Sequence, residues 1–96
     1  MRKYEIMFIV RPTLGEDEIK DVIKNFGKIL TSNGAKIIAE KDMKQRELAY
    51  EIKNFKSGYY YVYKIEAKDD KAIREFDRLA LINKDIVRHL ITKEED

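Results

Sequence analysis

The chain has 96 residues, which suits one domain built around a single hydrophobic core, and we expect that domain to span residues 1–96. It contains no cysteine, which excludes disulfide frameworks, thiolate metal sites and cysteine nucleophiles. Charged residues make up 40% of the chain, yet the net charge is only +2, so bulk charge gives weak support for a nucleic-acid binder.

The N-terminal part of the chain predicts a strand followed by a helix. Apolar residues occupy both faces of Tyr4–Val10, and Arg11-Pro12 ends this strand. Thr13 and Glu16 have the spacing of a capping box, which predicts a helix start. Asn33-Gly34 ends the helix, whose apolar stripe comprises Ile19, Val22, Ile23, Phe26, Ile29 and Leu30.

A second extended segment runs from Ala35 to about Lys53, and its apolar pattern changes phase. Apolar residues are odd-numbered at Ile37 and Ala39, but even-numbered farther on, at Leu48, Tyr50 and Ile52. A strand with a period of two cannot change parity without an extra residue. We therefore predict a bulge or kink within Glu40–Glu47.

The rest of the chain predicts a hairpin, a helix and a last strand. Asn54–Gly58 is predicted as the hairpin turn and Tyr59–Ala67 as the third strand. Asp69 or Asp70 caps the second helix, and Ile86–Thr92 forms the last strand. The apolar stripe of the second helix comprises Ile73, Phe76, Leu79 and Ala80.

The order strand, helix, strand, strand, helix, strand predicts an α+β fold. Two right-handed crossovers joined by a hairpin give the ferredoxin-like βαββαβ sandwich, in which two helices cover one face of a four-stranded antiparallel sheet. The first and third strands are apolar on both faces, which suits the centre of the sheet. The second and fourth are rich in charges, which suits its edges.

The third strand contains the run GYYYVYKI, which is close to an RNA-recognition signature whose aromatic residues stack on bases. Tyr61 and Tyr63 alternate with Lys64 and Glu66, which would be costly to bury beneath the helices. We therefore predict that Tyr61 and Tyr63 belong to the core and do not stack on bases.

The face of the sheet away from the helices, called the helix-free face below, is predicted to carry an apolar cluster on its central strands. The cluster comprises Met7, Ile9, Tyr60 and Val62. Two interpretations remain open: it is an interaction surface, or long side chains of neighbouring strands partly screen it.

No pattern in the chain points to catalysis, and no cofactor or metal is expected. His89 is the only histidine and is interpreted as a sheet residue. The four glycines form no phosphate-binding loop, and Arg11 alone is weak evidence for the anion site of an acylphosphatase. The N-terminus MRKYEIMFIV is too short and too charged for a signal peptide, so we expect a cytoplasmic protein without a membrane partner.

An ordered series of motifs runs over nearly the whole chain. It consists of the opening MRKYEIMFIVRPTL, then Arg46–Ile52 (RELAYEI) with Gly58-Tyr59-Tyr60 after it, and the closing Ile86–Ile91. In order and spacing this series resembles the family of the sixth protein of the bacterial small ribosomal subunit. Many members of that family have a basic pair before L-A-Y and a proline after it, where this chain has Arg46-Glu47 and Glu51.

The resemblance implies a structural protein that is not an enzyme. It implies binding to the central domain of small-subunit ribosomal RNA, largely through RNA shape and backbone, together with the eighteenth protein of the small subunit. Two alternatives remain: a small hydrolase of the acylphosphatase type, and a regulatory module that dimerises through its sheet.

Two groups of charged residues are candidate binding sites. We predict that ribosomal RNA contacts Arg2, Lys3, Arg88 and Lys93, because the first and last strands are expected to be antiparallel neighbours. This pairing would place Arg2 and Lys3 near Lys93 at one end of the sheet, with Arg88 farther along the edge. We predict that the companion protein contacts the edge of the second strand, through Lys41, Asp42, Arg46 and Glu47. The charges on this edge also discourage pairing with strands of other chains, and that role alone would account for them.

Overall fold

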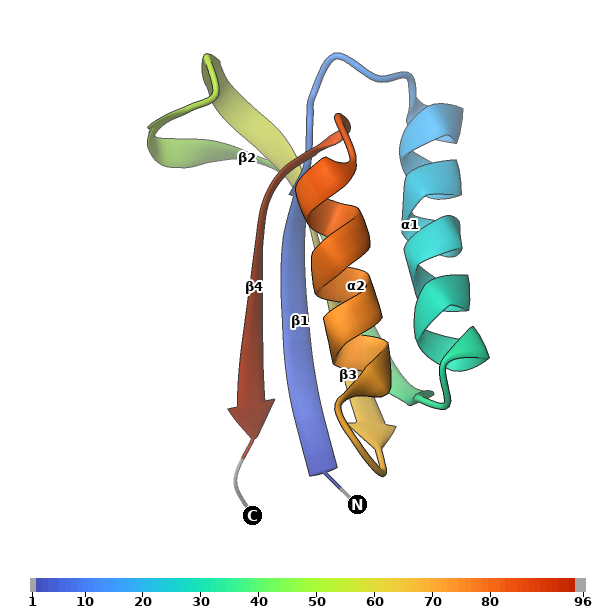
Figure 1. The fold of residues 1–96 in the computed structure, drawn as a ribbon. Coiled ribbons are helices and arrows are strands. Elements are labelled where there is room, and N and C mark those ends of the chain that lie inside the picture. Colours follow the sequence, from blue (N-terminus) through green and yellow to red (C-terminus); the bar gives the residue numbers. More distant parts are fainter. Residues whose placement is uncertain (1, 95–96) are drawn as a thin grey trace.

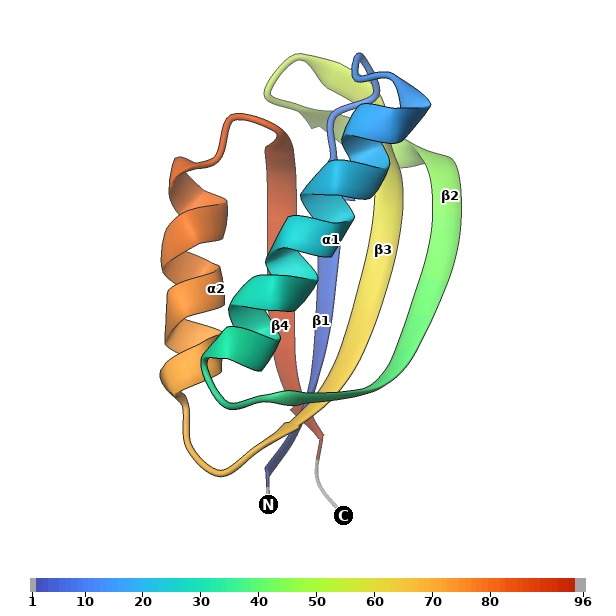
Figure 2. The same cartoon turned by 90° about the vertical axis from the view of Figure 1, so that its right-hand side faces the viewer.

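The computed structural model describes residues 2–94 and shows two helices on one face of a four-stranded antiparallel sheet (Figures 1 and 2). The order of the strands across the sheet is β2-β3-β1-β4, which confirms the predicted ferredoxin-like βαββαβ fold with β1 and β3 in the centre. The elements are β1 (Arg2–Val10), α1 (Glu16–Ser32), β2 (Lys36–Ile52), β3 (Phe55–Ala67), α2 (Lys71–Ile82) and β4 (Ile86–Glu94).

Three phenylalanine rings join the sheet to both helices. Phe8 of β1, Phe26 of α1 and Phe76 of α2 are almost completely buried. The centroid of the Phe8 ring lies 5.9 Å from that of Phe26 and 5.7 Å from that of Phe76. Burying one such side chain contributes about 1.5–3 kcal/mol to folding, so this contact fixes the two amphipathic helices on the sheet.

Tyr63 is a core residue, as predicted. Its side chain is 2% exposed, and its hydroxyl donates a hydrogen bond of 2.7 Å to the carbonyl oxygen of Ile23 in α1. A Cβ atom at Gly27 would lie 2.8 Å from the Tyr63 hydroxyl oxygen. Glycine costs about 1 kcal/mol inside a helix relative to alanine, and here it makes room for the tyrosine. Tyr61 also faces the core and is half-buried, with its ring centroid 5.9 Å from that of Phe8.

The start of α1 differs from the prediction. Gly15 occupies the N-cap position and no side chain caps the helix, so the predicted capping box of Thr13 and Glu16 is wrong. Thr13 has another partner, because its hydroxyl oxygen accepts a hydrogen bond of 2.6 Å from the Arg11 guanidinium. Arg11 is itself held by Asp85, with 2.7 Å between Nε and Oδ1, and this ion pair draws the residues after β1 towards the start of β4.

The start of α2 uses the predicted acids in an unexpected way. Asp70 is the N-cap residue, but its side chain does not cap the helix; it forms an ion pair with Arg74 at 3.0 Å. The carboxylate of Asp69 accepts the hydrogen bond from the backbone N–H of Lys71. Within residues 2–94, neither helix is long and apolar enough to cross a membrane.

The hairpin between β2 and β3 turns earlier than predicted. Lys53 and Asn54 have positive φ angles of 50° and 70°, and Ile52 pairs directly with Phe55. Two consecutive positive φ angles are typical of a two-residue type I′ turn, whose twist matches that of antiparallel strands. Residues 55–58 therefore belong to β3, and the prediction of Asn54–Gly58 as the turn is wrong.

The burial of Tyr63 gives a first prediction. Tyr63→Ser should lower the free energy of unfolding by about 2–5 kcal/mol, because it leaves a cavity and removes the bond to α1. Tyr50→Ser is the matched control: Tyr50 is 63% exposed, and its replacement should cost less than about 1 kcal/mol. Urea unfolding followed by circular dichroism measures both. A Tyr63→Ser variant as stable as the parent would contradict the assignment of this strand face to the core.

Candidate binding surfaces on the sheet

Strand β2 is interrupted three times where it pairs with β3. The predicted bulge within Glu40–Glu47 is confirmed at Met43, which has no partner of its own between Asp42 and Lys44. Another lies at Ile38 and was not predicted; it turns Ala39 to the helix-free face, so the expectation that Ala39 keeps the phase of Ile37 is wrong. The third lies between Glu47 and Ile52, where the register shifts from Glu47 opposite Ser57 to Ile52 opposite Phe55.

Two of the predicted partner-binding residues hold the bulge at Met43. The Asp42 carboxylate accepts hydrogen bonds from the backbone N–H of Lys44 at 3.0 Å and from the Tyr59 hydroxyl at 2.6 Å. The Nε–H of Arg46 donates to the carbonyl oxygen of Met43 at 3.1 Å. Lys44 has a φ of 60°, which is unfavourable for a lysine. The side chains of Asp42 and Arg46 thus stabilise a backbone conformation that bends the strand.

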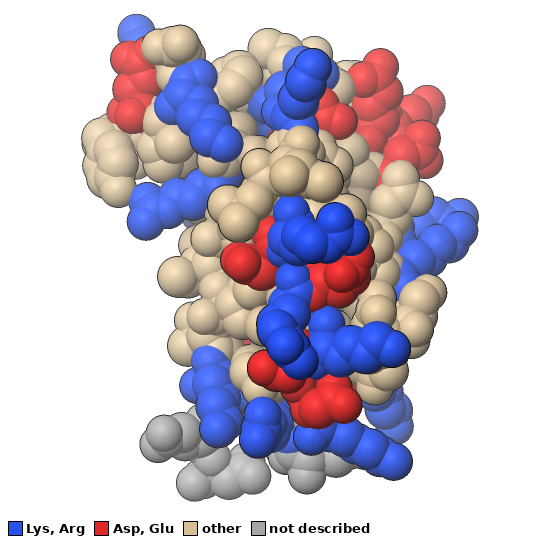
Figure 3. Space-filling model, viewed as in Figure 1, with Lys and Arg blue, Asp and Glu red and all other residues tan. Residues whose placement is uncertain are grey.

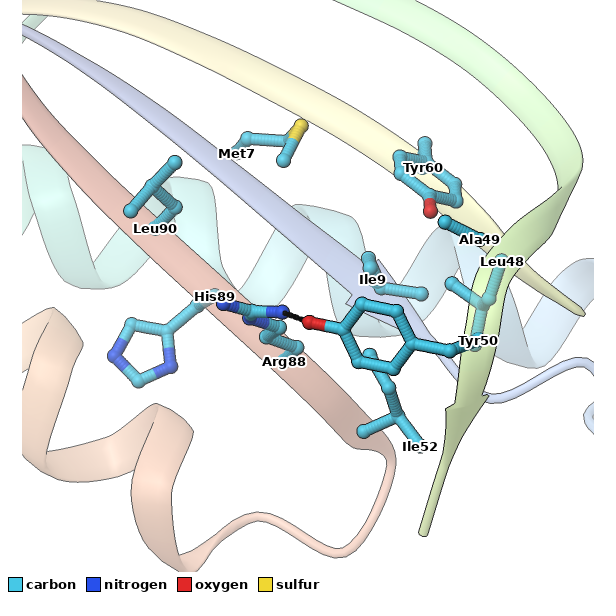
Figure 4. A pocket seen from close by; sticks show the side chains of 10 residues that line it. All are labelled: Met7, Ile9, Leu48, Ala49, Tyr50, Ile52, Tyr60, Arg88, His89 and Leu90. Atoms are coloured by element: carbon cyan, nitrogen blue, oxygen red, sulfur yellow. Dashed lines mark hydrogen bonds between the residues drawn. The ribbon is translucent and has the colours of Figure 1, made fainter. Parts of the chain in front are cut away.

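Because of these interruptions, the end of the hairpin bends away from the helices, as Figure 1 shows. Leu48, Tyr50 and Ile52 reach over the helix-free face and form one wall of a groove of about 270 Å³ (Figure 4). We call this the hairpin groove. Its floor and opposite wall come from the three other strands and include Met7, Ile9, Tyr60, Arg88 and Leu90.

Gly58 allows the hairpin to lie close to the central strands. A Cβ atom at this position would lie 2.3 Å from Cγ2 of Ile9 and 3.3 Å from the carbonyl oxygen of Val10. Ile9 is only 3% exposed as a result. Val62 is buried as well, whereas Met7 and Tyr60 are half-buried. The predicted apolar cluster is therefore partly screened, and over Ile9 the screen is the hairpin.

Arg88 closes the hairpin groove on the side of β4. Its guanidinium donates a hydrogen bond of 2.9 Å to the hydroxyl oxygen of Tyr50, which Figure 4 shows as a bridge across the groove. His89, the next residue, points away from the groove towards α2 (Figure 4). Its Nε2 lies 2.6 Å from Oδ1 of Asp77, so His89 links β4 to a helix, in agreement with its interpretation as a sheet residue.

The strand register separates the four predicted RNA-binding residues. Lys3 lies opposite Glu94, and Lys93 lies opposite Tyr4, so Arg2, Lys3 and Lys93 gather at one end of the sheet as expected. Arg88 lies opposite Ile9, towards the other end. Figure 3 shows Lys and Arg side chains around the end that holds the termini. Strand alternation places Lys3 and Arg88 on the helix-free face and the other two on the helix side.

The helix-free face has a charged half and an apolar half. Near the termini, Lys3 lies between Glu66 of β3 and Glu94 of β4, and Lys36 lies beyond Glu66. Lys64 adds an ion pair with Glu94 at 3.8 Å. Positive and negative side chains thus alternate across this half, whereas the apolar half lies beneath the hairpin.

The four predicted partner-binding residues are all exposed, but they point to both sides of the sheet. Lys41 lies opposite Val62 and Arg46 opposite Gly58, which places both on the helix-free face beside the hairpin groove. Asp42 lies opposite Tyr61 on the helix side, and Glu47 lies opposite Ser57.

The family model of ribosomal protein S6 matches residues 3–93 of the chain. The chain belongs to this family. The crystal structure of 30S ribosomal protein S6 from Thermotoga maritima is similar to it, with a TM-score of 0.93 and 29% identity over 97% of this chain and 87% of that one. A protein of Arabidopsis thaliana has a TM-score of 0.56 and 11% identity over 100% of this chain and 95% of that one, a likeness that shows the fold alone.

The hairpin groove of this S6-family chain was not predicted as a whole. The phase change in β2 was visible in the sequence, and the even-numbered Leu48, Tyr50 and Ile52 were its signal. Their contacts with Ile9 and Arg88 depend on how far the strand bends, and several linked interruptions set that angle. A contact between two particular distant residues leaves no periodic pattern in the sequence from which it could be predicted.

A second prediction concerns the close contact at Gly58. Gly58→Ala should lower the free energy of unfolding by about 1–3 kcal/mol, because the new methyl group overlaps the buried Ile9 side chain. Gly15→Ala is the control. A Cβ there meets nothing within 4 Å beyond its chain neighbours, and the less favourable alanine at the N-cap should cost below about 1 kcal/mol. Chemical unfolding of the three proteins under the same conditions tests this. If both variants lost the same free energy of unfolding, the methyl group at residue 58 would not be in steric conflict with Ile9.

Proposed function

We propose that this small-subunit ribosomal protein has a structural, non-enzymatic role in the cytoplasm. In this proposal it binds the central domain of small-subunit ribosomal RNA together with the eighteenth protein of the small subunit. The observation that carries the proposal is the match of the S6 family model to residues 3–93. The similarity to the Thermotoga maritima structure over 97% of the chain supports the same assignment.

The arrangement of Arg11 gives no support to an acylphosphatase-type activity. Such an activity would need an arginine that is free to hold an anion in the turn after β1. Here the Arg11 guanidinium donates to both Asp85 and Thr13. Its positive charge is thus already paired with a carboxylate, and the turn is used for structure.

Arg88 and Arg2 are the residues on which we base the RNA contact. Tyr50 accepts a single hydrogen bond from the Arg88 guanidinium, so further N–H donors remain available for phosphate oxygens. Arg2 is exposed at the end of β1, beside Lys93 of β4. The acids on either side of Lys3 reduce the positive potential around it, which makes it the weakest of the four candidates.

Neutralising the two arginines should weaken RNA binding. In the double variant Arg2→Gln, Arg88→Gln, log K for assembly of the RNA–companion complex should depend less steeply on log salt concentration. The magnitude of this slope should decrease by about one for each lost phosphate contact. The control is Arg74→Gln with Arg78→Gln, because these α2 arginines already pair with Asp70 and Glu75. Filter binding over a range of salt concentrations measures the slopes. An unchanged slope in the first variant would remove both residues from the RNA site.

The exposed edge of β2 is the proposed docking site for the companion protein. Arg46 is its strongest candidate. Within residues 2–94, Nε–H is the one guanidinium donor of Arg46 with a hydrogen-bond acceptor, and the other N–H groups can hold a carboxylate bidentately. Lys41 lies on the same face and adds positive charge, while Asp42 and Glu47 supply negative charge on the other side. Charges of both signs allow complementary ion pairs with one partner and disfavour others.

The Arg46→Ala variant tests this docking site. Its affinity for the companion, titrated calorimetrically with RNA present, should fall about tenfold or more, as expected for the loss of a charge-assisted pair. Amide NMR shifts of residues 42–44 in the free variant separate a change in the shape of the bulge from the loss of charge. Parent-like affinity would move the docking site to the hairpin groove, where Leu90→Glu should then abolish binding because Leu90 is 53% exposed there.

A further inference from the structure

A second groove lies on the helix side of the sheet, between α1 and β2, with a volume of about 450 Å³. Tyr59 and Tyr61 form its floor, Lys20, Lys24 and Lys28 of α1 line one wall, and Glu40 and Asp42 of β2 line the other. We call it the lysine–tyrosine groove. It is separate from the hairpin groove, which is on the opposite face of the sheet.

The two tyrosine rings are held in fixed positions on the floor. The Tyr59 hydroxyl donates to the Asp42 carboxylate at 2.6 Å, and the Tyr61 hydroxyl donates to the Glu40 carboxylate at 2.8 Å. Each ring therefore reaches from β3 across to β2 and lies over the strand pair. Burial, followed by the bond to Asp42, raises the pKa of Tyr59 to about 12. Burial and the bond to Glu40 also raise the pKa of Tyr61, so both hydroxyls stay protonated at neutral pH.

The lysine wall offers positive charge that the protein does not use elsewhere. Lys20, Lys24 and Lys28 are four residues apart and span about 12 Å along one side of α1. Lys20 makes a long ion pair of 3.9 Å with Glu16. Within residues 2–94, Lys24 and Lys28 have no carboxylate at ion-pair distance. On α2, by contrast, Arg74 and Arg78 are both paired.

This combination matches the chemistry of a single nucleic-acid strand. Proteins that bind such strands combine a row of positive side chains for the phosphates with aromatic rings on which the bases stack. The carboxylates of Glu40 and Asp42 each accept one tyrosine hydroxyl and keep further lone pairs, which can accept hydrogen bonds from the exocyclic amino groups of bases. They also repel phosphates, so the backbone of a bound strand belongs on the α1 side.

We propose that the lysine–tyrosine groove binds a single-stranded nucleic-acid segment, with phosphates along Lys20, Lys24 and Lys28 and an amino-bearing base over Tyr59. Tyr61 packs against Phe8 and Tyr63 and supports the floor from the core side, in keeping with its predicted place in the core. An extended acidic peptide fits less well. It would place carboxylates next to Glu40 and Asp42, and it has no planar group for the Tyr59 ring.

The experiment uses the whole chain, without companion or ribosomal RNA, and an eight-nucleotide oligoadenylate. Fluorescence anisotropy gives the affinity, and amide NMR shifts should map to residues 20–28 and 59–61. Lys24→Gln with Lys28→Gln should weaken binding about tenfold and lower the salt slope by about 1.4, because each phosphate contact on a single strand contributes about 0.7. Lys71→Gln with Lys84→Gln, two exposed lysines outside the groove, is the matched control and should bind like the parent.

The tyrosine floor is tested separately. Tyr59→Phe keeps the ring and should retain binding, whereas Tyr59→Leu removes the ring and should weaken binding about tenfold, a typical loss for one stacked base. Both variants are first shown to be folded by circular dichroism. An eight-nucleotide oligouridylate should bind more weakly than the oligoadenylate, since uracil has no exocyclic amino group.

Three results would overturn the proposal. The first is binding as tight as the parent's by the Lys24→Gln, Lys28→Gln variant, and the second is a set of amide shifts that map outside the groove. The third is equally tight binding of an oligoglutamate peptide, which would show that the lysines bind any polyanion and that base stacking plays no part. None of these results bears on assembly with the companion and ribosomal RNA. Failure here is therefore distinguishable from failure of the proposed function.

Discussion

The two central strands have apolar side chains on both faces, and each face has to be kept from water. The helices cover one face through the contact of Phe8 with Phe26 and Phe76. In the part of the chain that the structure describes, no helix covers the other face, and the hairpin folds back over Ile9 and covers part of it. The bending of β2 and the absence of a side chain at Gly58 both follow from this need. On the helix-free face, the surfaces available for binding are the parts that this cover leaves open.

The bulge at Met43 connects stability with the proposed function. The Asp42 carboxylate accepts hydrogen bonds from the backbone of Lys44 and the hydroxyl of Tyr59, and the Arg46 guanidinium donates one to the carbonyl oxygen of Met43. The charged residues of this edge therefore also determine the shape of the strand. Exposed charges on an edge are often explained as a barrier against pairing with other chains. Here some of them have partners within the chain as well. Substitutions at Asp42 or Arg46 therefore change the shape of the edge together with its charge.

The element order, the sheet order and the burial of Tyr63 could be predicted because each follows from a periodic pattern. Period-two alternation placed Lys64 and Glu66 on one face, and the opposite face could then only be the core. The turn at Lys53-Asn54 and the uncapped start of α1 were missed, because local choices between equivalent turn residues depend on tertiary contacts. Arg11 shows this plainly: its pairing with Asp85, 74 positions away, removes Thr13 from the role that its spacing suggested.

The candidate sites were predictable only in part. Register follows from topology, so the grouping of Arg2 with Lys93 and the separation of Arg88 were correct. The hydrogen bond between Arg88 and Tyr50 joins residues 38 positions apart and depends on the bend of the hairpin. The alternation of acids and bases around Lys3 arises from the register of three neighbouring strands, whose residues lie far apart in the sequence.

The sheet order has a consequence for the synthesis of the protein. β1 is made first, but one of its two neighbours, β4, is the last strand to be made. Until Ile86–Glu94 has left the ribosome, one edge of β1 lacks its backbone partner, and the apolar Ile6 and Phe8 are covered only by β3 and the helices. During that interval the nascent chain exposes an edge that the finished protein buries in the middle of its sheet, and this edge can pair with strands of other chains until β4 is added.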